Sequence, residues 1–327
     1  MKRALSLIGS KRKFRRFIHK SFAALSLVAF LFLIGVRAEA SEGGSSHYLP
    51  GTVGDALIAQ VPAPGLAVSN TVFVQSGDLG IALLGGELDF NLDLDLVLNL
   101  VSVIYPFETP FLGGRYSLGA AIPFGYLDIN AELHLPGIGA IDDSDTSFDI
   151  SDVAFIPLQL NWNFGAFSFK FAEVIIAPTG GYDVNETANL GTNYWSFDTA
   201  VAVTWFNTET NTEVSIAPGI QVNTENDDTH YKTGKEFHVD FTVNQFLSET
   251  FSIGLKGYYY RQITGDSGSG ATLGDFKSES LGFGPGFLWI PEFGGGNLTI
   301  LTKWMHDVTA DNRFESDYGT FTIAYKF

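Results

Sequence analysis

The chain has 327 residues, no cysteine, 36 glycines and 29 phenylalanines, and its formal net charge is −17. Without cysteine it forms no disulfides and has neither a cysteine nucleophile nor a thiolate metal site. The acidic balance argues against nucleic acid as a partner, because lysine and arginine are needed to neutralise phosphates.

The first forty residues have the organisation of a secretory signal peptide. Residues 1–20 are strongly basic, Phe22–Val36 is an uninterrupted apolar run, and Ala38-Glu39-Ala40 is a small-x-small cleavage pattern. The apolar run is shorter than the roughly 20 residues that a membrane anchor needs. We therefore predict a signal peptide over residues 1–40 and a mature chain that starts at Ser41. That chain has a net charge of −25, which suits cations or a lumen that repels anions.

Residues 41–64 read SEGGSSHYLPGTVGDALIAQVPAP and have no strand period. Their glycines and prolines predict an extended arm before the first strand. The arm is either a flexible tail or a plug inside the rest of the fold, and composition alone favours the tail.

The stretch Leu88–Leu100 alternates between large apolar and polar residues, with Val97 as the one exception on the polar side. Successive strand side chains point to opposite faces, so this pattern predicts a strand with one apolar and one polar face. The apolar row exceeds the roughly 9–11 residues that a tilted transmembrane strand needs. A soluble β-sandwich produces the same alternation. We predict that the leucine row faces lipid and that the aspartates face a lumen.

Similar alternation recurs along residues 65–327 and predicts an all-β, up-and-down antiparallel transmembrane barrel. Twelve strands are expected, an even number as in single-chain outer-membrane barrels, with short turns alternating with long polar loops. The segment Leu135–Ser151, with its four aspartates, is predicted to be one of these loops. The predicted strands are Gly65–Gln75, Glu87–Tyr105, Gly114–Leu133, Asp152–Phe164, Ala166–Ile176, Tyr194–Phe206, Thr212–Thr224, Lys235–Phe246, Thr250–Gln262, Ser278–Trp289, Asn297–Asp307 and Tyr318–Phe327.

Polar residues that alternate with the apolar rows are predicted to line the lumen. Charges of both signs can pair across a narrow barrel, which is a purely structural role for them. The predicted lumen-facing residues are Asp89, Asp93, Asp95, Lys170, Asp198, Glu236, His238, Asp240, Lys256 and Tyr258.

The last strand ends in a terminal phenylalanine preceded by aromatic and aliphatic residues of the same parity. This pattern resembles the C-terminal signal that the outer-membrane assembly machinery reads, and the residues concerned are Phe321, Ile323, Tyr325 and Phe327. Closing the barrel with this strand also removes the last free edge, which hydrocarbon does not tolerate.

The chain has no phosphate-binding glycine loop, dinucleotide fingerprint or Gly-x-Ser-x-Gly elbow, so no cofactor and no catalytic site are expected. An alternative is a lipid or ester hydrolase acting at the barrel rim, with His238 beside Asp240 as the base. The acidic run Asp142-Asp143-Ser144-Asp145, followed by Asp149, lacks the glycine and closing glutamate of a calcium loop. It is therefore interpreted as a solvated loop that can bridge loosely to lipopolysaccharide, and no metal site is predicted.

Several longer motifs resemble a known family. They are Pro178-Thr179-Gly180-Gly181-Tyr182-Asp183, Asn189–Phe197, Asn223–Asn226 leading to Thr229–His238, Gly257–Gly268, and Glu42–Gly51 near the mature start. Together they are similar to the outer-membrane proteins grouped with phenol meta-pathway degradation, over nearly the whole mature chain. The resemblance implies a barrel associated with uptake of aromatic or other hydrophobic compounds. It also favours an ordered arm, in the lumen as a plug, over residues 41–64.

We therefore expect a Gram-negative outer-membrane channel, porin-like, for passive uptake of small apolar or aromatic solutes. Its expected partners are the lipid bilayer, lipopolysaccharide, the assembly machinery and those solutes. The rim hydrolase, and a structural or adhesive surface barrel with a blocked lumen, are the two alternatives. The transported solute and the oligomeric state stay open.

Overall fold

The computed structural model describes residues 46–83, 88–135, 139–271 and 277–327. These ranges contain one short 3-10 turn, η1 (Glu292–Gly294), and otherwise β-strands and loops. They contain no helix that is long and apolar enough to span a membrane. The strands are β1 (Ala67–Leu83), β2 (Leu88–Pro106), β3 (Arg115–Leu135), β4 (Gly139–Ile150), β5 (Val153–Phe164), β6 (Phe167–Ala177), β7 (Ser196–Asn207), β8 (Thr212–Asn223), β9 (Glu236–Ser248), β10 (Phe251–Gln262), β11 (Glu279–Trp289), β12 (Leu298–Asp311) and β13 (Glu315–Lys326).

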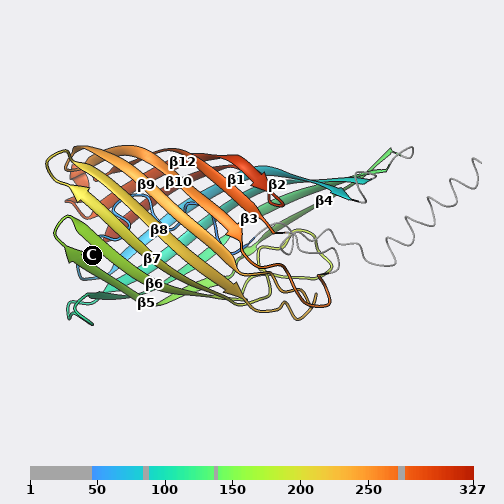
Figure 1. The fold of residues 1–327 in the computed structure, drawn as a ribbon, viewed down its shortest axis with the longest axis horizontal. Helices are drawn as coiled ribbons and strands as arrows, with labels where there is room; N and C mark the ends of the chain where they lie inside the picture. The colour runs from blue at the N-terminus through green and yellow to red at the C-terminus, as the bar shows by residue number, and fades with distance from the viewer. Residues whose placement is uncertain (1–45, 84–87, 136–138, 272–276) are drawn as a thin grey trace, which may run out of the picture. The chain divides into compact units, whose positions relative to one another are not determined.

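Twelve of these strands close into an antiparallel barrel, as the alternation predicted (Figure 1). Neighbours in sequence pair with each other, and β13 returns to pair with β1 from Ala67↔Lys326 to Asp78↔Glu315. Closure of the ring satisfies the backbone groups that hydrocarbon would leave unpaired. The prediction of an all-β, twelve-stranded barrel is therefore confirmed.

The two ends of the barrel differ in their connections. One end, here called the short-turn end, carries both the start of β1 and the end of β13, together with tight turns such as residues 165–166 and 249–250. The other end, the long-loop end, carries the connections 178–195, 224–235 and 263–278. The three longest connections therefore lie at one end, as the sequence predicted, although the short-turn end also carries the eight-residue connections 107–114 and 290–297.

The segment predicted as the acidic loop Leu135–Ser151 instead contains a thirteenth strand, β4, so the loop prediction was wrong. Strand β4 pairs with the far half of β3, from Phe124↔Ile150 to Leu135↔Gly139, while the near half of β3 pairs with β5. Strands β1–β4 consequently extend beyond the rest of the barrel at the long-loop end (Figure 1). The sequence concealed β4 because most of its residues on both faces are polar and exposed, which leaves no apolar row to recognise.

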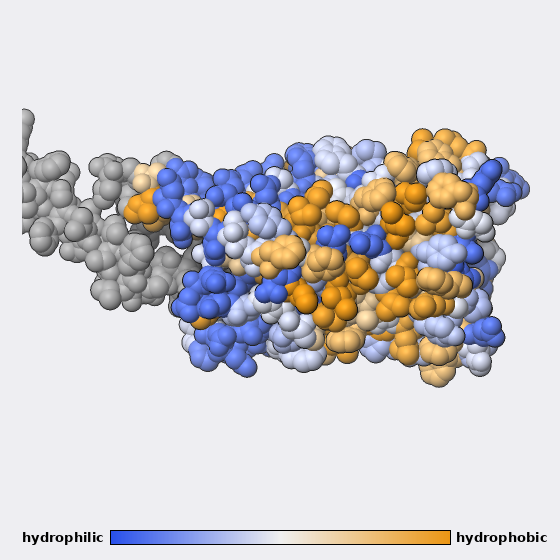
Figure 2. Space-filling model, turned by 180° about the vertical axis from the view of Figure 1, so that it is seen from behind, coloured by the Kyte–Doolittle hydropathy of each residue, from blue (hydrophilic) through white to orange (hydrophobic). Residues whose placement is uncertain are grey.

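A band of exposed apolar side chains lies on the outside of the barrel, and Figure 2 shows part of it. It includes Val201 on β7 and Val243 on β9, which are 47% and 43% exposed, and Ile323 on β13 at 44%. The predicted assembly residues Phe321, Ile323 and Tyr325 lie on this exposed face, and Phe327 is exposed as well. An apolar surface of this extent would favour aggregation in water, whereas it matches lipid chains.

The orientation predicted for β2 was wrong. Leu94 and Leu98 are buried in the interior, whereas Asp93 and Asp95 are exposed and share the outer face with Val97, which is 41% exposed. The leucine row faces inward because it packs in one cluster with interior side chains from β1, β3 and the arm. The side chain of Asp89 lies outside the described residues.

Candidate functional site

The arm before β1 lies among the inward-facing side chains of the barrel. From residue 46, near the long-loop end, it runs to Gly65 at the short-turn end, whose N–H donates to the carbonyl of Pro106 over 3.1 Å. It has little regular structure of its own, so its polar backbone groups need partners from the barrel wall. Those partners come from four clusters along its length.

The first cluster holds His47 at the long-loop end. Its Nε2 lies 2.8 Å from Asp152 Oδ2, and its Nδ1 lies 2.6 Å from Ser196 Oγ. Asp152 also accepts the backbone N–H groups of Gly180 and Thr192, over 2.8 and 2.7 Å. Burial raises the pKa of the Asp152 carboxyl, but the hydrogen bonds and positive field of His47, with the two N–H groups, outweigh it and leave the pKa below its ordinary value. Asp152 therefore ties the arm to the β6–β7 loop as a carboxylate.

The same cluster contains a serine, a histidine and an aspartate, so its suitability for hydrolysis can be tested. The Ser196 hydroxyl donates to Asn223 Oδ1 over 2.6 Å, so its oxygen can only accept a hydrogen bond from His47 Nδ1. A nucleophilic serine needs the opposite arrangement, in which its own proton points at an unprotonated histidine nitrogen. Ser196 is also fully buried. The geometry fits an anchor rather than a hydrolytic triad.

The second cluster surrounds Tyr48. Its ring stacks on His238, with centroids 4.3 Å apart and planes at 22°, and lies parallel to Tyr260 at 5.8 Å. Its hydroxyl donates to Asp240 Oδ2 over 2.8 Å. Burial, reinforced by the Asp240 charge, raises the pKa of Tyr48 well above its ordinary value, so the hydroxyl keeps its proton. Glycine at Gly219 on β8 makes room for the His238 ring, which a Cβ there would meet at 2.4 Å.

The third cluster binds the middle of the arm by charge. Lys303 on β12 pairs with the carboxylate of Asp55 and donates to the carbonyl of Gly51. Lys256 on β10 donates to the carbonyl of Asp55, as does Thr242 Oγ1 over 3.2 Å. Both lysines are buried, so each depends on these partners for the solvation that water would otherwise supply.

The fourth cluster fixes the arm near the short-turn end. The N–H of Leu57 donates to the buried Glu213 over 2.8 Å, and the N–H of Ala59 donates to Thr204 Oγ1 over 2.9 Å. Asn161 Nδ2 lies 3.2 Å from the carbonyls of both Ala59 and Gln60. Ala59 has no exposed surface, so the arm is packed against the barrel wall at this level.

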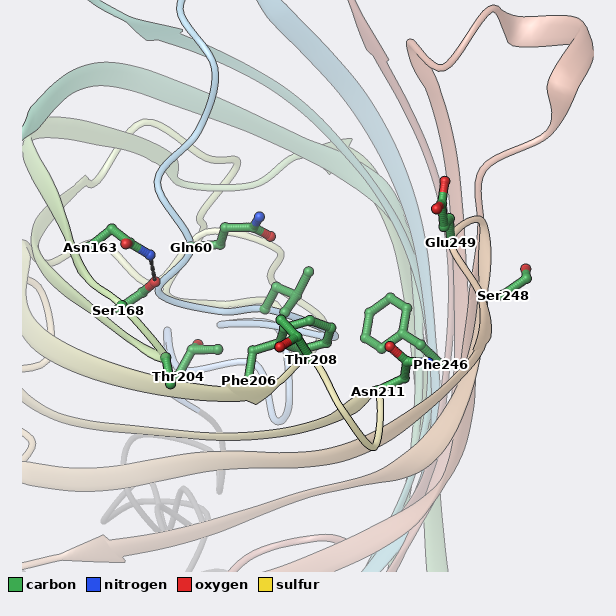
Figure 3. A pocket seen from close by; sticks show the side chains of 13 residues that line it. Gln60, Asn163, Ser168, Thr204, Phe206, Thr208, Asn211, Phe246, Ser248 and Glu249 are labelled. Carbon is green, nitrogen blue, oxygen red and sulfur yellow. Dashed lines mark hydrogen bonds between the residues drawn. The ribbon is translucent and has the colours of Figure 1, made fainter.

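Beyond this level the lumen widens into a cavity of about 740 Å³ at the short-turn end (Figure 3). Gln60 from the arm, Asn163 and Thr204 supply polar groups, and Asn163 donates to Ser168 over 3.1 Å. Phe206 and Phe246, whose ring centroids are 5.5 Å apart, supply an apolar side. This cavity is large enough for a small organic molecule.

Most of the predicted lumen residues lie inside the barrel. Glu236, His238, Asp240, Lys256 and Tyr258 are buried, and His238 Nε2 lies 2.9 Å from Asp198 Oδ1. Lys170 lies on the inner face of β6, opposite Ala202 of β7. The structure thus brings together His238, Asp198 and Asp240 around Tyr48, but Asp93 and Asp95 lie outside.

Several interior residues were missed by the sequence analysis. Lys303 and Glu213 each lie on a strand whose residues alternate between the inner and the outer face. That alternation could have identified both as inward-facing. Asp307 accepts the Tyr318 hydroxyl over 3.1 Å, and it was not among the predicted lumen-facing residues. Tyr48 and Asp55 lie in the aperiodic arm, where no pattern indicated which side chains bind the wall.

Comparison with known proteins places this barrel in a family. Residues 73–323 match the family model described as "Putative MetA-pathway of phenol degradation". The chain belongs to that family. A search of curated proteins finds no match.

Among solved structures, the fold is similar to the COG4313 outer membrane channel from Pseudomonas putida F1, with 14% identity and a TM-score of 0.67 over 86% of this chain and all of that one. The transport unit of the autotransporter AIDA-I from Escherichia coli matches with 13% identity and a TM-score of 0.44, over 80% of this chain and 90% of that one. The KdgM porin matches with 7% identity and a TM-score of 0.41, over 79% and 99%. At these identities the first match supports the fold alone.

Proposed function

We propose that this protein is an outer-membrane channel for passive uptake of small hydrophobic or aromatic compounds, with residues 41–64 as a plug in its lumen. The observation that carries the proposal is the apolar half of the inner wall. Leu79 on β1, Leu92 and Leu94 on β2 and Leu127 on β3 belong to one buried cluster that also contains Tyr48.

An apolar inner wall is a poor lining for a water-filled pore. Exposing apolar surface to water costs about 25 cal/mol per Å², and one fully exposed leucine side chain costs roughly 2 kcal/mol. A channel for hydrophilic solutes gains nothing from such a wall. An apolar solute, by contrast, moves along it without becoming hydrated.

The position of the cluster supports entry from the long-loop end. Leu79, Leu92 and Leu127 lie in the extension formed by β1–β4, on the side opposite to the exposed Asp93 and Asp95. Ala188 and Leu190 of the β6–β7 loop join the same cluster. An apolar solute that reaches this end therefore meets an apolar surface that continues to the arm.

The plug proposal rests on how the arm is held. Its directed bonds to the wall are hydrogen bonds and the ion pairs Lys303–Asp55 and His47–Asp152, which water can replace when the arm leaves. Tyr48, Ile58 and Ala59 of the arm also pack in apolar clusters with the wall. Ala59 and Tyr48 are nevertheless buried, so the docked arm blocks the lumen at two levels. Reversible undocking of the arm would open the route.

The proposed location follows from the outer surface and the export signal. The apolar band suits the bilayer, residues 1–40 would direct export before cleavage, and the closing strand carries the residues that the assembly machinery would read. The acidic outer face of the β1–β4 extension would lie beside lipopolysaccharide, whose bridging cations it can share.

Planar-bilayer conductance tests the proposal. The refolded mature protein is compared with a variant that lacks residues 41–60, each with and without toluene. We expect little steady current from the mature protein and a steady current from the shortened one, with toluene raising the opening frequency of the former. A shortened variant that conducts no better than the mature protein would overturn the plug and favour a structural barrel with a blocked lumen.

A further inference from the structure

Tyr48 is the one tyrosine, phenylalanine or tryptophan in residues 46–64, and its side chain is itself a phenol. We propose that the slot around Tyr48 is a binding site for phenols, in which the arm's own tyrosine occupies the place of a hydroxylated aromatic solute. Such a solute would displace the Tyr48 side chain and so promote release of the arm. This inference rests on the proposed function and names its solute class.

The walls of the slot are aromatic. The Tyr48 ring lies nearly parallel to His238 and to Tyr260, and Tyr258 is tilted against it at 6.2 Å. The Arg313 guanidinium lies 4.1 Å from the centre of the Tyr260 ring and donates to the Tyr48 carbonyl over 3.3 Å. Stacking of this kind recognises a flat ring in any aromatic solute.

The walls are also fixed in place by their own strands. A Cβ at Gly219 would meet the His238 ring, and a Cβ at Gly282 on β11 would come within 2.7 Å of the Tyr258 ring. Glycines at these two positions let both rings lie against the barrel wall. The three ring walls of the slot, His238, Tyr258 and Tyr260, therefore belong to the barrel strands β9 and β10, and the proposal requires that they keep their places when the arm leaves.

The far end of the slot selects for a hydroxyl group. Asp240 is 1% exposed and accepts the Tyr48 hydroxyl with Oδ2, while its Oδ1 has no hydrogen-bond partner among the described residues. A ring without a hydroxyl would leave Asp240 with its ion pair to His238, whose Nδ1 lies 3.8 Å from Oδ2, and without a donor from the ligand. A buried acceptor disfavours such a ligand, because the lost hydrogen bond is not replaced by water.

Competition with the arm sets the affinity. Because Tyr48 is tethered to the barrel, its effective concentration at the slot is in the millimolar range or above. A free phenol binds the wild-type protein only to the extent that the slot is vacant, so its apparent affinity falls by that fraction. Removing the Tyr48 ring should reveal the intrinsic affinity.

Titration by ¹⁹F NMR of the full mature protein in lipid nanodiscs tests the inference, with 4-fluorophenol and fluorobenzene as probes and empty nanodiscs as the partition blank. The variant Tyr48→Ala should bind 4-fluorophenol at least about tenfold more tightly than the wild type. It should prefer 4-fluorophenol over fluorobenzene by about tenfold or more, as expected for a hydrogen bond to a charged group. Adding Asp240→Asn should reduce that preference several-fold. Tyr105→Ala on the outer face is the matched control and should behave as wild type.

Equal affinity of Tyr48→Ala for the two probes, or no gain over the wild type, would overturn the inference. If Tyr48→Ala does not fold, hydrogen exchange of the wild type replaces it. Phenol should then accelerate exchange of residues 46–60 in a concentration-dependent way, and benzene at equal membrane concentration should not. Equal responses to both solutes would overturn the inference as well.

The two proposals fail separately. A steady current from the variant that lacks residues 41–60, together with no phenol binding by Tyr48→Ala, would overturn the phenol site and support the channel. Phenol binding by Tyr48→Ala, together with a shortened variant that stays closed, would remove the channel and leave a phenol-binding barrel.

Discussion

The inner wall of this barrel has two different halves. On β1–β3 it is apolar, with Phe73, Leu94 and Leu127 buried. Across the ring, on β7–β10 and β12, it is polar and charged, with Thr204, Glu213 and Lys256 among the residues that hold the arm. The arm contacts both halves, but most of its hydrogen bonds to wall side chains go to the polar half.

The two halves of the wall therefore suit two different tasks, which are to bind the arm and to guide a solute. Hydrogen bonds and ion pairs fix one chain in one register, because each requires a partner at a defined position. An apolar surface sets no register and accepts any molecule that removes it from water. The polar half therefore suits the plug and the apolar half suits a mobile solute. Changes in the two halves should have different effects.

Removing the Lys303 side-chain charge should have the largest effect on the plug. In Lys303→Met the partly buried Asp55 carboxylate loses its cation, and breaking a buried pair in this way costs up to roughly 3–5 kcal/mol. We expect hydrogen-exchange protection of residues 46–60 to fall by about a hundredfold or more. Lys235→Met, at an exposed position, is the control. Unchanged protection in Lys303→Met would show that the charge cluster does not hold the arm.

Truncation in the apolar half should affect the barrel more than the arm. Leu94 is 7% exposed, and Leu→Ala in a packed interior costs about 2–5 kcal/mol. We expect the free energy of unfolding of Leu94→Ala, measured by urea titration in lipid vesicles, to fall by about 2 kcal/mol. Asp93→Ala, on the other face of the same strand, should change it by less than about 0.5 kcal/mol. A larger loss of unfolding free energy in Asp93→Ala than in Leu94→Ala would indicate that the leucine row faces lipid.

Acid should loosen the arm through Asp152. Its pKa is lowered in the folded protein, so the stabilisation from its hydrogen bonds is complete above its ordinary pKa of about 3.9 and is lost as the pH falls through the lowered value. An environment-sensitive dye on Thr52→Cys, in a chain without other cysteines, should report arm release below about pH 4. Asp152→Asn should loosen the arm at neutral pH and lose this acid step. An identical titration in Asp152→Asn would assign the step to another group.

Much of the fold could be predicted from the sequence, because the membrane imposes an apolar outer row on most strands. Phe167 and Phe169 on β6, or Val201 on β7, are exposed and apolar, and their neighbours face inward. Strand β4 could not be found in this way, since its place beyond the barrel leaves both faces free to be polar. The partners of the arm were equally inaccessible, because Tyr48 and Asp55 bind side chains that lie 192 and 248 residues further along the chain.

Strand β2 shows why alternation alone does not tell inside from outside. A period of two is unchanged when the two faces are exchanged, so direction has to come from packing. On β2 the inner leucines meet Tyr48 and the other members of the interior cluster, and the outer face changes along the strand from Asp93 and Asp95 to Val101 and Val103. Only the second part of that outer face resembles a lipid-facing row.

The smallest expected effect follows from this orientation and is the most direct test of it. Asp93 and Asp95, if they lined the lumen, would attract cations, and Asp93→Asn with Asp95→Asn would lower the cation preference of the open channel. Since both lie on the outer face, the reversal potential of the variant without residues 41–60 should not change when they are replaced. Glu213→Gln on the inner wall of the same variant is the positive control and should shift it toward anions. Replacing the two aspartates would contradict this orientation if it shifted the reversal potential as much as Glu213→Gln does. That result would place the acidic face of β2 in the lumen, and the apolar half of the inner wall would then exist only while the arm is docked.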